Sequence, residues 1–86
     1  MSLSKDPTRE EIVEYLGQHF PMYEVSEFDL ECAIYWFAHH NYDGQGSDLY
    51  RLMCDSPYRP GAFEAQPDLD SIAGEMYEAL NEAIKS

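Results

Sequence analysis

Residues 26–41 read SEFDLECAIYWFAHHN, and this stretch decides the fold. Ser26 suits the position before a helix, because its hydroxyl can accept a hydrogen bond from a main-chain N–H of the first turn, and Asp29 favours the helix dipole there. At 100° per residue, apolar and aromatic side chains fall on nearly every side, and polar residues occupy only narrow seams. A helix of this kind is normally surrounded by other helices. We therefore expect residues 26–41 to form a central helix.

This central helix has two apolar faces. One carries Leu30, Ala33, Ile34 and Phe37, and the opposite one, called the aromatic face below, carries Phe28, Cys32, Tyr35, Trp36 and His39. The rest of the chain, a second copy or a partner protein must cover the aromatic face, and cover from within the chain is the more frequent arrangement. Trp and Tyr are enriched in protein interfaces. The candidate interaction surface is therefore Phe28, Tyr35, Trp36 and His39 with Tyr58 and Arg59 of the loop that follows.

Three further segments have helical periodicity, namely residues 7–19, 47–54 and 67–84. Asp6 or Thr8 can cap the first segment, and Pro21 prevents it from continuing. Ser47 can cap the short segment, which would not be stable alone. The last segment places one set of apolar residues on a single face: Leu69, Ile72, Ala73, Met76, Leu80, Ala83 and Ile84.

The fold class predicted from these segments is all-α. We expect a compact array of three main helices and one short helix, with a long ordered loop that contains the prolines and glycine of residues 55–63. A chain of 86 residues has room for one hydrophobic core, so residues 1–86 are interpreted as a single helical domain.

The charge of the chain narrows the classes of partner. Seventeen acidic residues against five basic ones give a net charge of −12, and the excess extends along the whole sequence. Such a field repels nucleic acid and anionic lipid and attracts basic partners, so we expect neither direct nucleic-acid binding nor membrane binding. The two cysteines form no close-spaced pair, and no leader or long apolar run is visible, which indicates a cytoplasmic protein with free thiols.

The residues that could carry chemistry are few. His39 and Asp43 would lie one helical turn apart and are weak candidates for metal ligands. Cys32 lies about 10 Å along the helix from His39, too far to share an ion with it or to use it as a base. We therefore predict no metal, no cofactor and no catalytic residue.

Two rows of carboxylates are expected on solvent-facing helix surfaces. One consists of Glu10, Glu11 and Glu14, and the other of Glu75, Glu78 and Glu82. Such rows usually serve solvation, but they can also imitate the phosphates of a nucleic acid. The resulting hypothesis is a protein-interaction or regulatory module that binds a partner protein or a second copy. The first alternative is an acidic nucleic-acid mimic of the phage-inhibitor type that occupies a basic DNA- or RNA-binding protein, and the second is a small metal- or thiol-dependent enzyme.

The packing of the central helix can be tested directly. Replacement of Phe37 by Ala should leave a cavity and lower the free energy of unfolding by about 3 to 5 kcal/mol, measured by chemical denaturation. A loss below about 1 kcal/mol would mean that the face carrying Phe37 is not the one inside.

Overall fold

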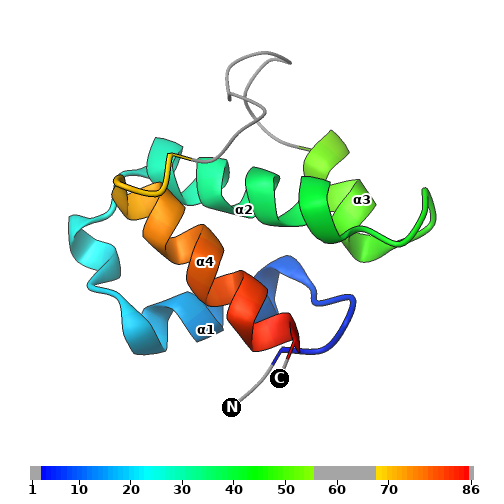
Figure 1. The fold of residues 1–86 in the computed structure, drawn as a ribbon, viewed down its shortest axis with the longest axis horizontal. Coiled ribbons are helices and arrows are strands. Elements are labelled where there is room, and N and C mark those ends of the chain that lie inside the picture. The colour runs from blue at the N-terminus through cyan, green and yellow to red at the C-terminus, as the bar shows by residue number, and fades with distance from the viewer. Residues whose placement is uncertain (1–2, 56–67, 86) are drawn as a thin grey trace.

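The computed structural model describes residues 3–55 and 68–85. Within them the chain forms four α-helices, one short 3-10 helix and no strand, which confirms the all-α class (Figure 1). The helices are α1 (Arg9–His19), η1 (Met22–Glu24), α2 (Glu27–Asn41), α3 (Asp48–Cys54) and α4 (Ile72–Lys85). Most of the predicted Pro/Gly loop, with Tyr58 and Arg59, lies outside the described residues.

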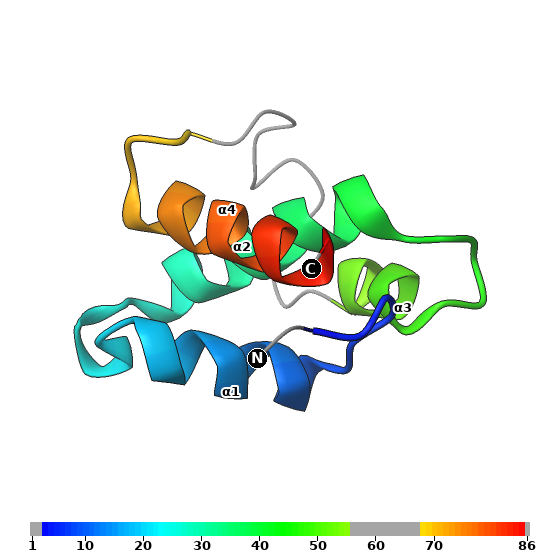
Figure 2. The ribbon, with the colours of Figure 1, turned by 60° about the horizontal axis from the view of Figure 1, so that its bottom comes forward.

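Helix α2 is the central element. Both α3 and α4 pack on it, and α1 lies below α2 and α4 in both ribbon views (Figures 1 and 2). The two ends of the described chain meet, because the Leu3 N–H donates to the Ala83 carbonyl oxygen at 3.2 Å. The predicted central position of residues 26–41 is therefore confirmed.

The hydrophobic core has Phe37 of α2 fully buried. The other three α-helices also contribute large side chains with no exposed surface to this core. They are Ile12 and Leu16 of α1, Leu49 of α3, and Met76 and Leu80 of α4. On its opposite face, α2 also buries Cys32 and Trp36. Both apolar faces of α2 are thus used for packing.

Hydroxyl side chains cap the N-termini of the first three α-helices. The Thr8 hydroxyl accepts from the Glu11 N–H at 3.2 Å, and the Glu11 carboxylate accepts in return from the Thr8 N–H, so α1 begins at Arg9 and not at residue 7. Ser26 and Ser47 accept from main-chain N–H groups at 3.1 Å, as predicted. These caps satisfy donors that have no partner within a helix.

Asp6 was one of the two residues predicted to cap α1, but Thr8 takes that position and Asp6 caps α3 instead. Its carboxylate accepts from the N–H groups of Asp48 and Leu49, both at 3.0 Å, at the start of α3. A negative charge is favourable at the N-terminus of a helix. The N-terminal segment therefore helps to stabilise a seven-residue helix that would not persist alone.

An ion pair joins α1 to α2. Glu31 is 4% exposed, and its carboxylate accepts a hydrogen bond from the guanidinium of Arg9. A buried carboxylate needs such a partner, because desolvation of an unpaired charge is costly.

Helix α4 begins at Ile72, five residues later than predicted, so the expected start at residue 67 is wrong. Asp68 instead forms a turn in which its side chain accepts from the Asp70 N–H, and the Ser71 hydroxyl then accepts from the Gly74 N–H at 3.0 Å. Polar side chains that bond to nearby main chain compete with helix in this way. As a consequence Leu69 is 51% exposed and does not lie on the buried face.

Two glycines provide a matched test of this turn. A Cβ on Gly74 would lie 2.0 Å from the main-chain oxygen of Asp68, whereas a Cβ on Gly17 would contact nothing within 4 Å. We expect Gly74→Ala to lower the free energy of unfolding by about 2 kcal/mol or more, because the turn must move. Gly17→Ala should raise it by about 0.5 to 1 kcal/mol through helix propensity, as measured by urea denaturation. Equal effects of the two substitutions would contradict the close approach at Gly74.

Candidate interaction surface

The residues of the aromatic face differ in how far they are buried. Trp36 is 5% exposed, and its ring stands edge-on to Tyr77 of α4 with the ring centroids 6.3 Å apart. Phe28 is 43% exposed, and His39 is exposed with its ring 5.9 Å from that of the half-buried Tyr35. Tyr35 and His39 therefore lie together near the surface, whereas Trp36 is part of the core.

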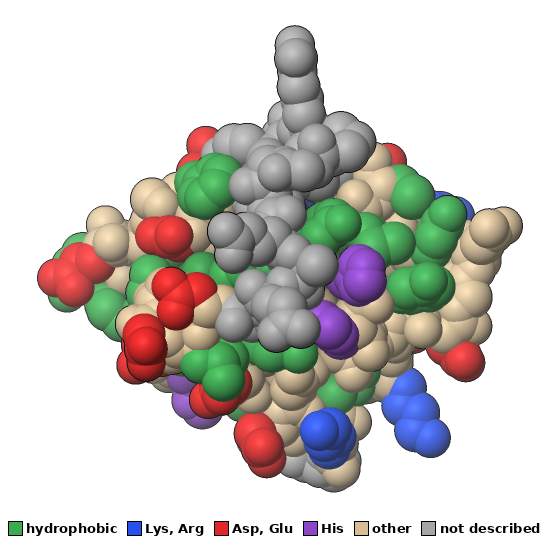
Figure 3. All heavy atoms as spheres, turned by 45° about the horizontal axis from the view of Figure 1, so that its top comes forward, with side chains coloured by type: hydrophobic (Ala, Val, Ile, Leu, Met, Phe, Trp, Pro, Cys, Tyr) green, Lys and Arg blue, Asp and Glu red, His purple; other side chains and the backbone are tan. Residues whose placement is uncertain are grey.

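Histidines extend this group of rings from α2 to α4. The rings of His39 and His40 lie 5.2 Å apart, and that of His40 lies 5.7 Å from Tyr77. Figure 3 shows two adjacent histidine side chains beside hydrophobic ones on this side of the molecule. His40 and Tyr77 were not among the predicted site residues, because their proximity depends on how α4 packs against α2.

The geometry expected for His39 and Asp43 is not found. Helix α2 ends at Asn41, and Tyr42 takes an extended conformation with φ −67° and ψ 148°, so Asp43 no longer follows His39 at one helical turn. Within residues 3–55 and 68–85, no group of three or more His, Cys, Asp or Glu side chains is placed to hold a metal ion.

The two thiols have different surroundings. Cys32 is buried, and burial, followed by the charge of Asp29, raises the pKa of its thiol to about 11. Cys54 is exposed at the end of α3, and a hydrogen bond between its thiol and the Tyr50 hydroxyl raises the pKa of Tyr50. A nucleophilic cysteine requires a thiolate, so the environment of Cys32 opposes that role.

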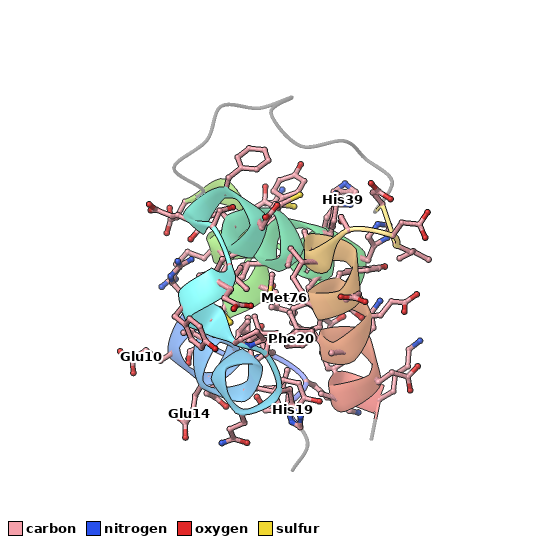
Figure 4. All side chains as sticks on the ribbon, turned by 90° about the vertical axis from the view of Figure 1, so that its left-hand side faces the viewer. Glu10, Glu14, His19, Phe20, His39 and Met76 are labelled. Carbon is pink, nitrogen blue, oxygen red and sulfur yellow. The ribbon has the colours of Figure 1, made fainter. Side chains whose placement is uncertain are left out.

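The two predicted carboxylate rows do not form one surface. Glu10 and Glu14 point outward from α1, whereas α4 lies on the other side of the molecule in this view (Figure 4). Glu11 is used in the cap of α1. The second row, Glu75, Glu78 and Glu82, is exposed on the side of α4 that faces away from the core.

This second row lines an open hollow of about 670 Å³, called the α4 hollow below. Besides the three glutamates, the lining consists of Phe20, Leu69, Tyr77, Ala79, Asn81 and Lys85. Phe20 reaches it from the end of α1 and points inward in Figure 4. The α4 hollow thus combines three carboxylates and one ammonium group with apolar and aromatic surface. Neither Phe20 nor Leu69 was predicted as a site residue, and Leu69 was expected on the buried face of α4.

A smaller hollow of about 120 Å³ lies between the start of α1 and α3. Its charged residues are Arg9 and Arg51 with Asp48 and Asp55. Charges of both signs are therefore present in this hollow, and Arg9 is already paired with Glu31.

Comparison with known proteins gave no relatives. No protein-family model, curated protein sequence or solved structure matches this chain. A search of the described helices for one of sufficient length and apolar character to cross a bilayer found none.

The contrast between the thiols can be measured. In the native protein at pH 8, Ellman's reagent should react rapidly with Cys54 and very slowly with Cys32, because a thiol of pKa about 11 is almost entirely protonated. Both should react once the chain is unfolded in guanidinium chloride. With Cys54→Ser as the control, rapid reaction of the remaining native thiol would show that Cys32 is accessible and ionised.

Proposed function

We propose that this chain is a protein-interaction module that binds a cationic segment of a partner protein in the α4 hollow. The observation that carries the proposal is the combination of Glu75, Glu78 and Glu82 with exposed apolar surface in one hollow. Carboxylates attract Lys and Arg, and the apolar surface offers a place for the methylene chains of those residues or for an adjacent apolar side chain.

Both parts of the hollow are needed for useful affinity. An exposed ion pair contributes about 0.2 to 1 kcal/mol, so pairs at Glu75 and Glu78 give a weak complex by themselves. Apolar contact adds about 25 cal/mol for each Å² removed from water. Leu69 is half exposed and is therefore available for such contact. The net charge of −12 adds long-range attraction that accelerates association with a basic protein.

The same charge argues for a partner of a different kind over a second copy of the chain, because two acidic hollows would repel each other. A nucleic-acid mimic remains a related proposal, in which one carboxylate row would replace phosphates at a basic protein. The separation of the rows on α1 and α4 favours use of one row at a time. We place the module in the reducing cytoplasm, a proposal supported by the free state of Cys32 and Cys54.

A matched pair of double variants tests the proposal. The probe is a fluorescein-labelled peptide of alternating lysine and leucine blocks, and its affinity is measured by fluorescence anisotropy. Glu75→Gln with Glu78→Gln should weaken binding by about 2- to 30-fold, the loss of two exposed ion pairs. Glu10→Gln with Glu14→Gln removes the same charge from α1 and should have little effect.

Salt provides a second measurement for the same proposal. An increase from 50 to 300 mM NaCl should weaken binding of the wild type more than that of the α4 double variant, because screening acts on the pairs that the variant has lost. Equal loss of affinity in both double variants would show that the peptide responds to total charge and not to the α4 hollow.

A further inference from the structure

We infer that Asp43 and Gly44 form a site of spontaneous covalent modification, at which the aspartate is converted to isoaspartate, and that this conversion weakens the cap of α3. The two residues lie in the connection between α2 and α3 and are not part of the α4 hollow. The inference follows from the chemistry of an Asp–Gly pair, from the state of one main-chain N–H and from the hydrogen bonds of Ser47.

The reaction needs only the chain and water. The main-chain nitrogen of Gly44 forms a bond to the side-chain carboxyl carbon of Asp43, and the hydroxyl of the protonated carboxyl group leaves as water with the amide hydrogen. The product is a succinimide ring. Water then opens this ring at either carbonyl group. Opening at the side-chain carbonyl restores aspartate, whereas opening at the main-chain carbonyl leaves Gly44 joined through the side chain, which is isoaspartate of unchanged mass.

The main-chain N–H that follows Asp43 differs from those that follow other aspartates. Three of those N–H groups are already held in hydrogen bonds, and they belong to Leu30 after Asp29, Leu49 after Asp48 and Ser71 after Asp70. A nitrogen held in this way must lose its hydrogen bond before it can reach the carboxyl carbon. Among the described residues, none accepts a hydrogen bond from the Gly44 N–H.

Gly44 gives the carboxyl group of Asp43 no steric protection. Asp43 is the only aspartate in the sequence that is followed by glycine, and both residues are exposed. A Cβ added to Gly44 would contact nothing within 4 Å. Gly44 has φ 127°, a conformation that residues with a side chain rarely adopt. The turn after α2 therefore requires the residue that makes Asp43 reactive.

Ser47 connects this site to α3. Its N–H and its hydroxyl donate to the Gly44 carbonyl oxygen at 3.1 and 2.8 Å, and the same hydroxyl oxygen accepts from the Tyr50 N–H at 3.1 Å. Isoaspartate adds a methylene group to the main chain directly before Gly44, and so displaces the oxygen that holds Ser47. The cap of α3 is then weakened, and a seven-residue helix depends on such contacts.

Incubation of the full chain at pH 7.4 and 37 °C for several weeks tests the modification. Trypsin then releases residues 10–51, which contain Asp29, Asp43 and Asp48. We expect a second form of this peptide with unchanged mass, which endoproteinase Asp-N does not cleave before residue 43 and which protein isoaspartyl methyltransferase methylates. Asp29 and Asp48 are internal controls, and cleavage before them should be retained.

Two variants separate this chemistry from other changes of the loop. Asp43→Glu keeps the carboxylate but would need a larger ring, so the modified form should not accumulate. Asp43→Asn loses ammonia in place of water and should form isoaspartate several-fold faster than the wild type. Absence of isoaspartate at residue 43, equal formation at Asp29 and Asp48, or equal accumulation in Asp43→Glu would overturn the inference.

Hydrogen exchange tests the effect on α3. In the purified isoaspartyl form, the Tyr50 N–H should exchange several-fold faster than in the unmodified chain, and N–H groups in the middle of α4 should change far less. Ser47→Ala is the matched comparison, because it removes the same cap without the modification. If exchange at Tyr50 increases in Ser47→Ala but not in the isoaspartyl form, the inferred link to α3 is wrong.

Discussion

Burial of α2 on two opposite sides is the constraint on which the structure depends. Phe37 has no exposed surface on one side, and Trp36 is nearly buried on the other. Covering both sides occupies the apolar face of every other helix, since Ile12 and Leu16, Leu49, and Met76 and Leu80 all join the same core. What remains exposed is the outer face of each surrounding helix. The carboxylates of α4 are exposed because the apolar face of this helix packs against α2 and its charged face is turned to solvent.

Polar contacts determine the orientations of the helices relative to one another, which apolar packing alone does not specify. Asp6 ties the N-terminal segment to α3, Arg9 ties α1 to the buried Glu31, and the Asn41 amide donates to the Phe37 carbonyl oxygen and to the Asn81 side-chain oxygen. A single hydrogen bond of this kind contributes only about 0.5 to 1.5 kcal/mol net, but it requires one orientation. Together these contacts orient α1 and α4 against α2 and hold the N-terminal segment on α3, and so determine where Asn81 and its neighbours on α4 face.

The sequence contains enough information to predict the helices but not the candidate site. Periodicity identified the four α-helices, and the caps at Ser26 and Ser47 could be predicted because each hydroxyl and the main-chain N–H that donates to it are three residues apart. The start of α4 was missed, because the turn at Asp68 satisfies local hydrogen bonds that a helical wheel does not consider. The α4 hollow was missed for a different reason. It combines Phe20 with residues that follow some fifty positions later, and only tertiary packing brings them together.

The two carboxylate rows show why position in the fold matters more than composition. Glu10 and Glu14 stand on α1 and point away from the protein, so a ligand there would meet charge alone (Figure 4). The row on α4 borders Tyr77, whose ring also contacts Trp36 and His40. Through Tyr77 the lining of the hollow is anchored to the core, and a partner would find its apolar contacts already in place. Less side-chain entropy is then lost on binding. The same ion pairs therefore give a higher affinity than they would on a surface that must first become ordered.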